Sequence, residues 1–141
     1  MKASDGILLV EDNKIDIINF KRAFSRNNIT NPLMITRNGE DALAFLNHEP
    51  PHGGATRPAL ILLDLNMPVM NGLELIEIIK SDPGLCTIPV VVITTSKEPR
   101  DRRACFRLGV SGYIIKPMEF IEFVEAIATL HHYWSLCELA D

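Results

Sequence analysis

The chain has 141 residues, of which 47% are hydrophobic and 23% charged, and its formal net charge is −4. A chain of this length allows one domain with a substantial core and argues against two. The net negative charge gives no electrostatic reason to expect nucleic acid or an anionic membrane as partner. No apolar run approaches the roughly 20 residues of a membrane span, and the first residues lack a signal-peptide pattern, so we expect a cytoplasmic protein.

Short apolar runs alternate along the chain with segments whose apolar residues recur at helical spacing. Five runs predict strands: ILLV (7–10), LMI (33–35), ALILL (59–63), VVVI (90–93) and YII (113–115). Because these runs lack alternation with polar residues, both faces of the sheet should be covered. Between the first two runs, Ile17, Phe20 and Phe24 lie on one face of a predicted helix. Five strand–helix units predict an α/β fold with a parallel sheet and helices on both faces.

Charged and hydroxyl side chains stand at the ends of four predicted strands. These residues are Glu11, Asp12, Asp64, Thr94 and Lys116. Parallel strands bring these ends to one edge of the sheet, which is where such folds bind ligands. Neighbouring carboxylates repel one another unless a cation neutralises them, and Mg²⁺ prefers oxygen ligands of this kind. An ammonium and a hydroxyl on the same edge suit a phosphoryl group. The pattern therefore predicts Asp64 as a nucleophile that forms an aspartyl phosphate.

Each of these residues alone also has an ordinary structural explanation. An Asp after a strand more often caps a helix or forms a turn, so Asp12 could cap the first helix. Thr94 could cap a turn, and Lys116 could pair with any surface carboxylate. The functional interpretation therefore depends on the joint occurrence of these residues at four different strand ends.

Four motifs, ILLVEDN, LILLDLNMPVMNG, IPVVVITTS and GVSGYIIKP, together resemble the receiver domains of bacterial two-component response regulators. The resemblance covers nearly the whole chain and implies a flavodoxin-like, doubly wound sheet of five parallel strands in the order 2-1-3-4-5. It implies that residues 1–141 form a single receiver domain and that the protein is not a turnover enzyme. A sensor histidine kinase would phosphorylate it, and phosphorylation would change its contacts with a downstream protein.

The resemblance also assigns roles to the acidic residues at the carboxyl ends of the predicted strands. Asp64 matches the phosphoacceptor. Glu11 and Asp12 match the acidic pair that holds Mg²⁺, joined by Asp64 and by the backbone carbonyl of Asn66. Glu11 stands where many members have a second Asp, and we expect only a small change in geometry from this difference.

Three further residues match the family's switch and phosphoryl-binding positions. Thr94 corresponds to the hydroxyl that moves onto the phosphoryl group, and Tyr113 to the aromatic ring that rotates inward with it. Lys116 would bind the phosphoryl group. The resemblance further implies a cis peptide bond between Lys116 and Pro117.

Two other functional classes compete with the switch. A phosphatase or phosphotransferase that works through an aspartyl phosphate usually carries a second Asp two residues after the nucleophile, and here that residue is Asn66. A flavin-binding electron carrier of the same architecture would need a phosphate-binding loop rich in Ser, Thr and Gly after the first strand. The sequence EDNKID places carboxylates there instead.

The segment from about residue 118 onward predicts one long final helix. Its apolar residues recur at spacings of three and four: Phe120, Phe123, Ile127, Leu130, Trp134 and Cys137. We expect the core to cover this stripe as far as about Leu130, leaving Trp134 exposed as a contact of a symmetric homodimer. The alternative is an ordinary core stripe followed by a frayed tail. A single domain with an extended last helix also resembles regulators paired with bacterial phytochrome kinases.

Overall fold

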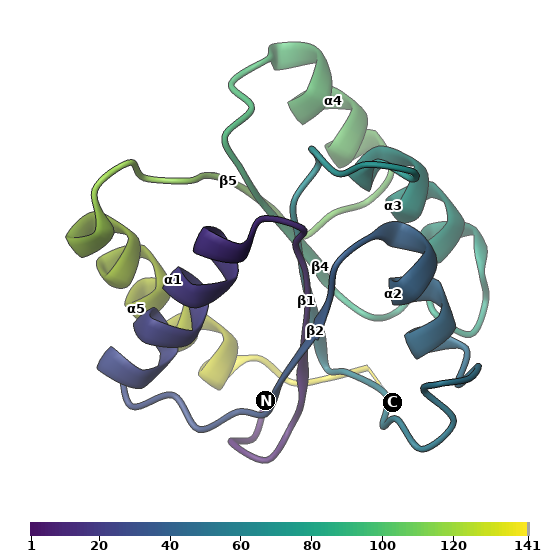
Figure 1. Ribbon diagram of the computed structural model, residues 1–141, viewed down its shortest axis with the longest axis horizontal. Helices are drawn as coiled ribbons and strands as arrows, with labels where there is room; N and C mark the ends of the chain where they lie inside the picture. Colours follow the sequence, from purple (N-terminus) through teal and green to yellow (C-terminus); the bar gives the residue numbers. More distant parts are fainter. Residues whose placement is uncertain (141) are drawn as a thin grey trace.

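The computed structural model describes residues 1–140, in which five strands alternate with five helices (Figure 1). The strands are β1 (Ile7–Val10), β2 (Leu33–Thr36), β3 (Leu60–Leu63), β4 (Val90–Thr94) and β5 (Gly112–Ile115). The helices are α1 (Lys14–Arg26), α2 (Gly39–Leu46), α3 (Gly72–Ser81), α4 (Pro99–Arg107) and α5 (Phe120–Leu136). None of these helices combines the length and the apolar character that crossing a membrane would require.

The strands form one parallel sheet in the order β2-β1-β3-β4-β5, which confirms the predicted topology. The order reverses between β1 and β3, so the crevice where such sheets bind ligands lies beyond the carboxyl ends of these two strands. Val10 pairs with Leu63, and Leu63 pairs with Val92. The three central strands therefore end close together, and the residues that follow them share one edge.

Two apolar layers cover the two faces of the sheet. Ile7 and Leu9 face one cluster together with residues of α1 and α5, whereas Leu8 and Val10 face a second cluster with residues of α2, α3 and Cys105 of α4. Figure 1 shows α1 and α5 on one side of the sheet and α2, α3 and α4 on the other. The central strands β1, β3 and β4 are buried on both faces, as the continuous apolar runs predicted, whereas the edge strands β2 and β5 are only partly buried.

The first three helices begin at asparagine caps, and the last two do not. The side chains of Asn13, Asn38 and Asn71 each accept a backbone N–H from the first turn of α1, α2 and α3. Helix α4 begins with Pro99 and α5 with Phe120, and neither has a side-chain cap. The capped helices follow β1, β2 and β3, so the loops around Glu11 and Asp64 lead into fixed helix starts.

The prediction that Trp134 is exposed is wrong. Helix α5 does extend to Leu136, but Trp134 is only 4% exposed, and its ring lies 6.0 Å from that of Phe24. The reason is that α1 and α5 pack against each other and α1 continues to Arg26, so its last turn covers the indole. At the other end of this contact, Phe20 and Phe123 meet edge to face at 4.9 Å. We call the set Phe20, Phe24, Phe123, Ile127 and Trp134 the α1–α5 seam.

Candidate functional site

Three carboxylates converge at the carboxyl edge of the sheet. Glu11 directly follows β1 and Asp64 directly follows β3, and both side chains are buried. Asp16, in the first turn of α1, joins them, because one oxygen from each of the three carboxylates lies within 4.8 Å of the others. Burying like charges this closely is costly unless cations offset it.

The Lys116 side chain is the cation at the centre of this cluster. Its Nζ donates hydrogen bonds to Glu11 Oε1 at 2.5 Å, Asp16 Oδ2 at 3.0 Å and Asp64 Oδ2 at 3.2 Å. The backbone N–H of Lys116 donates to the carbonyl of Thr94 at 2.8 Å, which fixes the residue beside the end of β4. Lys116 therefore joins β5 to the ends of β1 and β3 through buried ion pairs.

Burial and charge act in opposite directions on these groups. Burial raises the pKa of Glu11 to about 7, although the hydrogen bond and charge of Lys116 lower it, and the charge of Asp64 raises it further. Burial alone would lower the pKa of Lys116, but its contacts with Glu11, Asp64 and Asp16 outweigh burial and raise it above its usual value. One ammonium thus serves three carboxylates, and the cluster keeps an excess of negative charge. An all-oxygen donor set of this charge fits a hard divalent cation such as Mg²⁺ or Mn²⁺.

Two predicted metal ligands lie beside this cluster rather than within it. Asp12 is partly buried, and its backbone carbonyl accepts a hydrogen bond from Arg37 at 2.9 Å. Its carboxylate is not among the three that converge. Asn66 is exposed in the loop after Asp64, and its N–H donates to Asp64 Oδ1 at 3.3 Å.

Asp16 was not among the site residues predicted from the sequence, because it does not lie at a strand end. A signal was available: Asn13 is a residue type that caps helices, which would place Asp16 in the first turn of the following helix, beside the end of the first strand. Asn13 fixes this helix start by accepting the N–H groups of Ile15 and Asp16 at 2.9 and 3.0 Å. An acidic residue in a first turn also interacts favourably with the helix dipole.

The hydroxyls of Thr94 and Tyr113 meet at Ser96 rather than at Asp64. Thr94 is fully buried at the end of β4, and its Oγ1 accepts the N–H of Ser96 at 3.3 Å. The Tyr113 hydroxyl donates to the carbonyl of Ser96 at 3.0 Å. Ser96 Oγ in turn donates to Asp101 Oδ2 of α4 at 2.6 Å. The loop between β4 and α4 therefore connects both predicted switch residues to α4.

A glycine closes the loop that follows Asp64. The N–H of Gly72 donates to the carbonyl of Leu65 at 2.9 Å. A Cβ added at Gly72 would lie 2.6 Å from the carbonyl oxygen of Asp64 and 2.7 Å from Cα of Leu65, which is closer than real Cβ atoms approach. This position therefore requires the absence of a side chain, because the backbone of Asp64 occupies that space.

The expectation of a cis peptide bond between Lys116 and Pro117 is wrong. Within residues 1–140 the cis bond is Pro50–Pro51, and the bond before Pro117 is trans. The trans form is the intrinsically preferred isomer of a bond before proline. Lys116 makes all three of its carboxylate contacts in this form.

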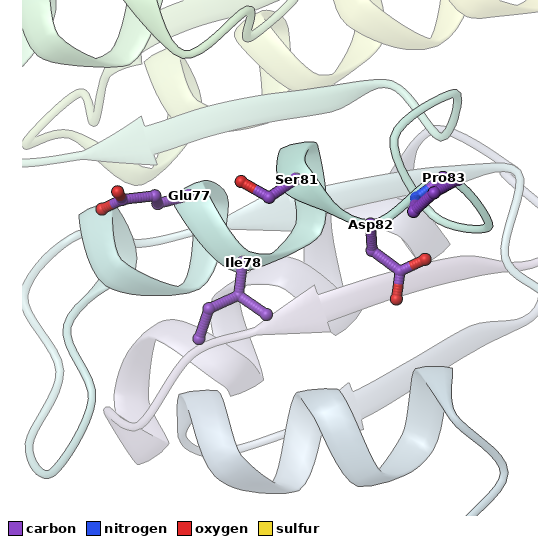
Figure 2. Close-up of a pocket in the computed structure, with 5 residues that line it drawn as sticks. All are labelled: Glu77, Ile78, Ser81, Asp82 and Pro83. Carbon is purple, nitrogen blue, oxygen red and sulfur yellow. The ribbon is translucent and has the colours of Figure 1, made fainter.

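A surface hollow beside the end of α3 offers no comparable convergence. It is lined by Glu77, Ile78, Ser81, Asp82 and Pro83. In Figure 2 the side chains of Glu77, Ile78 and Asp82 point in different directions, and no polar atoms converge on one point. Helix α3 leads away from the carboxyl edge, so this hollow also lies away from Asp64. The candidate site is therefore the cluster of Glu11, Asp16, Asp64 and Lys116 at the carboxyl edge of the sheet, which we call the acidic edge.

Residues 7–128 match the model of one protein family, the response regulator receiver domain. The chain belongs to this family. This family functions in two-component signalling, and its members are generally non-enzymatic signalling proteins.

Two relatives extend the match. The chain is 39% identical over 129 residues to the probable methanogenesis regulatory protein FilR2 of Methanothrix harundinacea, covering 91% of this chain and 82% of that one. It is 38% identical over 128 residues to the response regulator Rcp1 of Synechocystis sp., covering 91% of this chain and 87% of Rcp1. The receiver therefore aligns with nearly the full length of both relatives.

Solved receiver structures agree with the fold. The phosphorylated cyanobacterial phytochrome response regulator RcpA superposes with a TM-score of 0.91 at 36% identity, covering 97% of this chain and 99% of that one. Rcp1 has been solved in a Mn²⁺-bound form, which superposes with a TM-score of 0.90 at 36% identity and the same coverage. A divalent metal is thus compatible with a receiver of this shape, as the donor set of the acidic edge also indicates.

Proposed function

We propose that the protein is a phosphorylation-dependent switch in which Asp64 accepts a phosphoryl group from a sensor histidine kinase. The observation that carries this proposal is the placement of the Asp64 carboxylate. It stands at the end of a fully buried strand, 3.2 Å from the Lys116 ammonium and beside the buried Glu11. A carboxylate held this way is a fixed nucleophile next to a positive charge.

The transfer needs few groups beyond those at the edge. A carboxylate oxygen of Asp64 attacks the phosphorus and forms the new O–P bond, while the N–P bond to the kinase histidine breaks and its electron pair stays on the imidazole nitrogen. Bound Mg²⁺, held by Glu11, Asp12, Asp64 and the carbonyl of Asn66, would supply charge neutralisation for the phosphoryl oxygens.

Lys116, Thr94 and Tyr113 complete the proposed switch. Lys116 donates to the phosphoryl group as an ammonium donor. Thr94 leaves its contact with Ser96 and donates to a phosphoryl oxygen. This frees the loop that Tyr113 and α4 share, and Tyr113 turns inward. Phosphorylation thereby changes the surface around α4 and β5 and shifts the equilibrium between two arrangements.

Labelling with a small phosphodonor tests the central step. The wild type, incubated with acetyl phosphate and Mg²⁺, should gain the mass of one phosphoryl group in intact-mass spectrometry. Asp64→Asn should gain none, and chelation of Mg²⁺ should stop labelling of the wild type. Equal labelling of Asp64→Asn and the wild type would show that the phosphoryl group is attached to another residue. It would therefore rule out Asp64 as the phosphoacceptor.

We also propose a phytochrome as the kinase class, because RcpA is a phytochrome response regulator at 36% identity over nearly the whole chain. Phosphotransfer from a panel of the host's histidine kinases, with a phytochrome among them, tests this point. Preferential transfer from the phytochrome supports it, and faster transfer from another kinase rejects it.

A symmetric homodimer through α5 and its neighbours remains our proposal, with different contacts from those predicted. The outer face of α5 and the residues before it carry exposed apolar side chains, namely Met118, Ile121, Tyr133 and Leu136. Acidic residues lie among them: Glu119, Glu122 and Glu125. The segment 97–107, which includes α4, exposes basic residues: Lys97, Arg100, Arg102, Arg103 and Arg107. A second copy could pair its α4 with this acidic face, because the charges are complementary.

Light scattering with a matched pair of variants tests the dimer. Ile121 on α5 and Ile18 on α1 are 56% and 54% exposed, so Ile121→Glu and Ile18→Glu impose similar changes on different faces. We expect a dimer for the wild type and Ile18→Glu, and a monomer for Ile121→Glu. A monomeric wild type at high micromolar concentration, both with and without phosphorylation, would reject the dimer.

A further inference from the structure

We propose that Asp16 is a positioning residue that holds the Lys116 ammonium in the unphosphorylated protein and competes with the phosphoryl group for it. This inference rests on the proposed phosphorylation of Asp64. It concerns a residue outside the strand ends, on the first turn of α1. Asp16 would act through Lys116 and would thereby set how readily the phosphorylated arrangement forms.

The position of Asp16 is fixed by the start of α1. Asn13 caps this helix through its contacts with the N–H groups of Ile15 and Asp16. The Asp16 carboxylate then reaches Lys116 Nζ at 3.0 Å, across the gap between α1 and the end of β5. A capped helix start offers little freedom to the backbone, so this contact is part of the fold rather than a chance surface pair.

The number of donors on Lys116 creates the competition. A lysine ammonium has three N–H donors and no acceptor. In this structure three carboxylates accept from it, at 2.5, 3.0 and 3.2 Å. No donor remains for another acceptor. Asp64 now receives one of the three donors. If Lys116 is to give a second donor to a phosphoryl group on Asp64, either Glu11 or Asp16 must lose its hydrogen bond.

Solvent exposure decides which carboxylate gives way. The side chains of Glu11 and Asp64 are 1% and 9% exposed, whereas that of Asp16 is 33% exposed. Losing the ammonium would leave Glu11 as an uncompensated buried charge, which is costly. Asp16 lines a hollow of about 70 Å³ next to Lys116, Asn19 and Met118, where water can replace the lost partner. Asp16 is therefore the partner that can release Lys116 at low cost.

The test measures binding of a phosphoryl analogue, beryllofluoride, in the presence of Mg²⁺, by ¹⁹F NMR titration. Asp16→Asn keeps the size of the side chain but removes its charge, so Lys116 should be freer to contact the analogue. We expect its affinity to rise about threefold to tenfold, which lies at the lower end of the coupling between residues in contact. Asp16→Glu keeps the charge and should stay closer to the wild type.

Removing a negative charge close to the site strengthens anion binding by itself, so a second comparison isolates the role of Lys116. Glu77→Gln removes one charge from the exposed surface of α3 and should leave the affinity unchanged. In a Lys116→Ala background, Asp16→Asn should no longer raise the affinity, because Asp16 would act through the ammonium. The ratio of affinities in the two backgrounds gives the coupling directly.

The outcomes separate this inference from the proposed function. If the wild type binds no beryllofluoride, both the proposed phosphorylation of Asp64 and the proposed role of Asp16 are rejected. If the wild type binds it and Asp16→Asn binds equally well, only the role of Asp16 is overturned. The same holds if the gain persists in the Lys116→Ala background, since simple repulsion would then explain it. A tenfold or greater loss of Mg²⁺ affinity in Asp16→Asn would make Asp16 a metal ligand and would also overturn the inference.

Discussion

The acidic edge and the α1–α5 seam are both largely buried, but the edge is built from charged side chains and the seam from apolar ones. Of the five buried polar or charged residues among residues 1–140, four lie at the carboxyl ends of strands: Glu11, Thr36, Asp64 and Thr94. The seam joins the same sheet to two helices through aromatic and aliphatic contacts. The edge keeps like charges together at a cost in stability, and the seam contributes stability without any charge.

This difference implies that stability and chemistry can be separated by mutation. A change in the seam should lower the free energy of unfolding and leave phosphorylation intact. A change at the edge should alter phosphorylation, and its effect on stability should depend on the cations present. The predictions below test this separation, beginning with the largest expected effect.

A truncation in the seam should lower the free energy of unfolding by the largest amount. Trp134→Ala removes a buried indole that packs on Phe24, and we expect the free energy of unfolding to fall by about 4 kcal/mol. Urea denaturation measures this change. Ile18 of α1 is exposed and lies outside the proposed dimer contacts, so Ile18→Ala should stay within about 0.5 kcal/mol of the wild type.

Under conditions where Trp134→Ala is still folded, its labelling by acetyl phosphate should match that of the wild type. A folded variant that labels much more slowly would show that the seam and the edge are coupled.

Removing the central cation should have the next largest effect. Lys116→Ala leaves Glu11 and Asp64 buried without their ammonium partner, and we expect a loss of about 3 kcal/mol when metal is chelated. Added Mg²⁺ should recover more stability in the variant than in the wild type, because it supplies the missing positive charge. Denaturation of both proteins with EDTA and with Mg²⁺ gives this difference.

Lys21→Ala, which removes an exposed lysine from α1, is the matched control and should show neither effect. An equal Mg²⁺ response in Lys116→Ala and the wild type would argue against a shared role of ammonium and metal at this edge.

The smallest effect on stability should come from Tyr113, which contacts Ser96 rather than the carboxylates of the acidic edge. Tyr113→Phe removes one hydrogen bond to the Ser96 carbonyl and should cost about 1 kcal/mol. Amide hydrogen exchange should quicken in the loop between β4 and α4, while the amides of α1 stay protected. Unchanged exchange in that loop would show that the tyrosine does not restrain it.

Most of the fold could be predicted because the signals were local. Continuous apolar runs marked all five strands to within one residue at each end, and the regular alternation with helical segments indicated the parallel sheet. Asp64, Glu11 and Lys116 could be placed at a common edge because strand direction alone determines where the residues after parallel strands lie.

The errors arose where one helix depends on another. The burial of Trp134 depends on how far α1 extends beside α5, and no periodicity within α5 contains that information. Asp16 escaped notice for a related reason, because its contact with Lys116 joins the first turn of α1 to the end of β5 across 100 residues of sequence. The isomer of the bond before Pro117 was inferred from the family and not from a local signal.

The glycine that closes the loop after Asp64 bears on which natural variants this chain can tolerate. The exposed residues Pro68 and Val69 precede Gly72 in the same loop, and their side chains lie at the surface. At Gly72 even alanine would press on the carbonyl oxygen of Asp64 itself. A neutral-looking substitution at this position would therefore act on the proposed site, because it would displace the proposed phosphoacceptor without changing any of the side chains assigned to the chemistry.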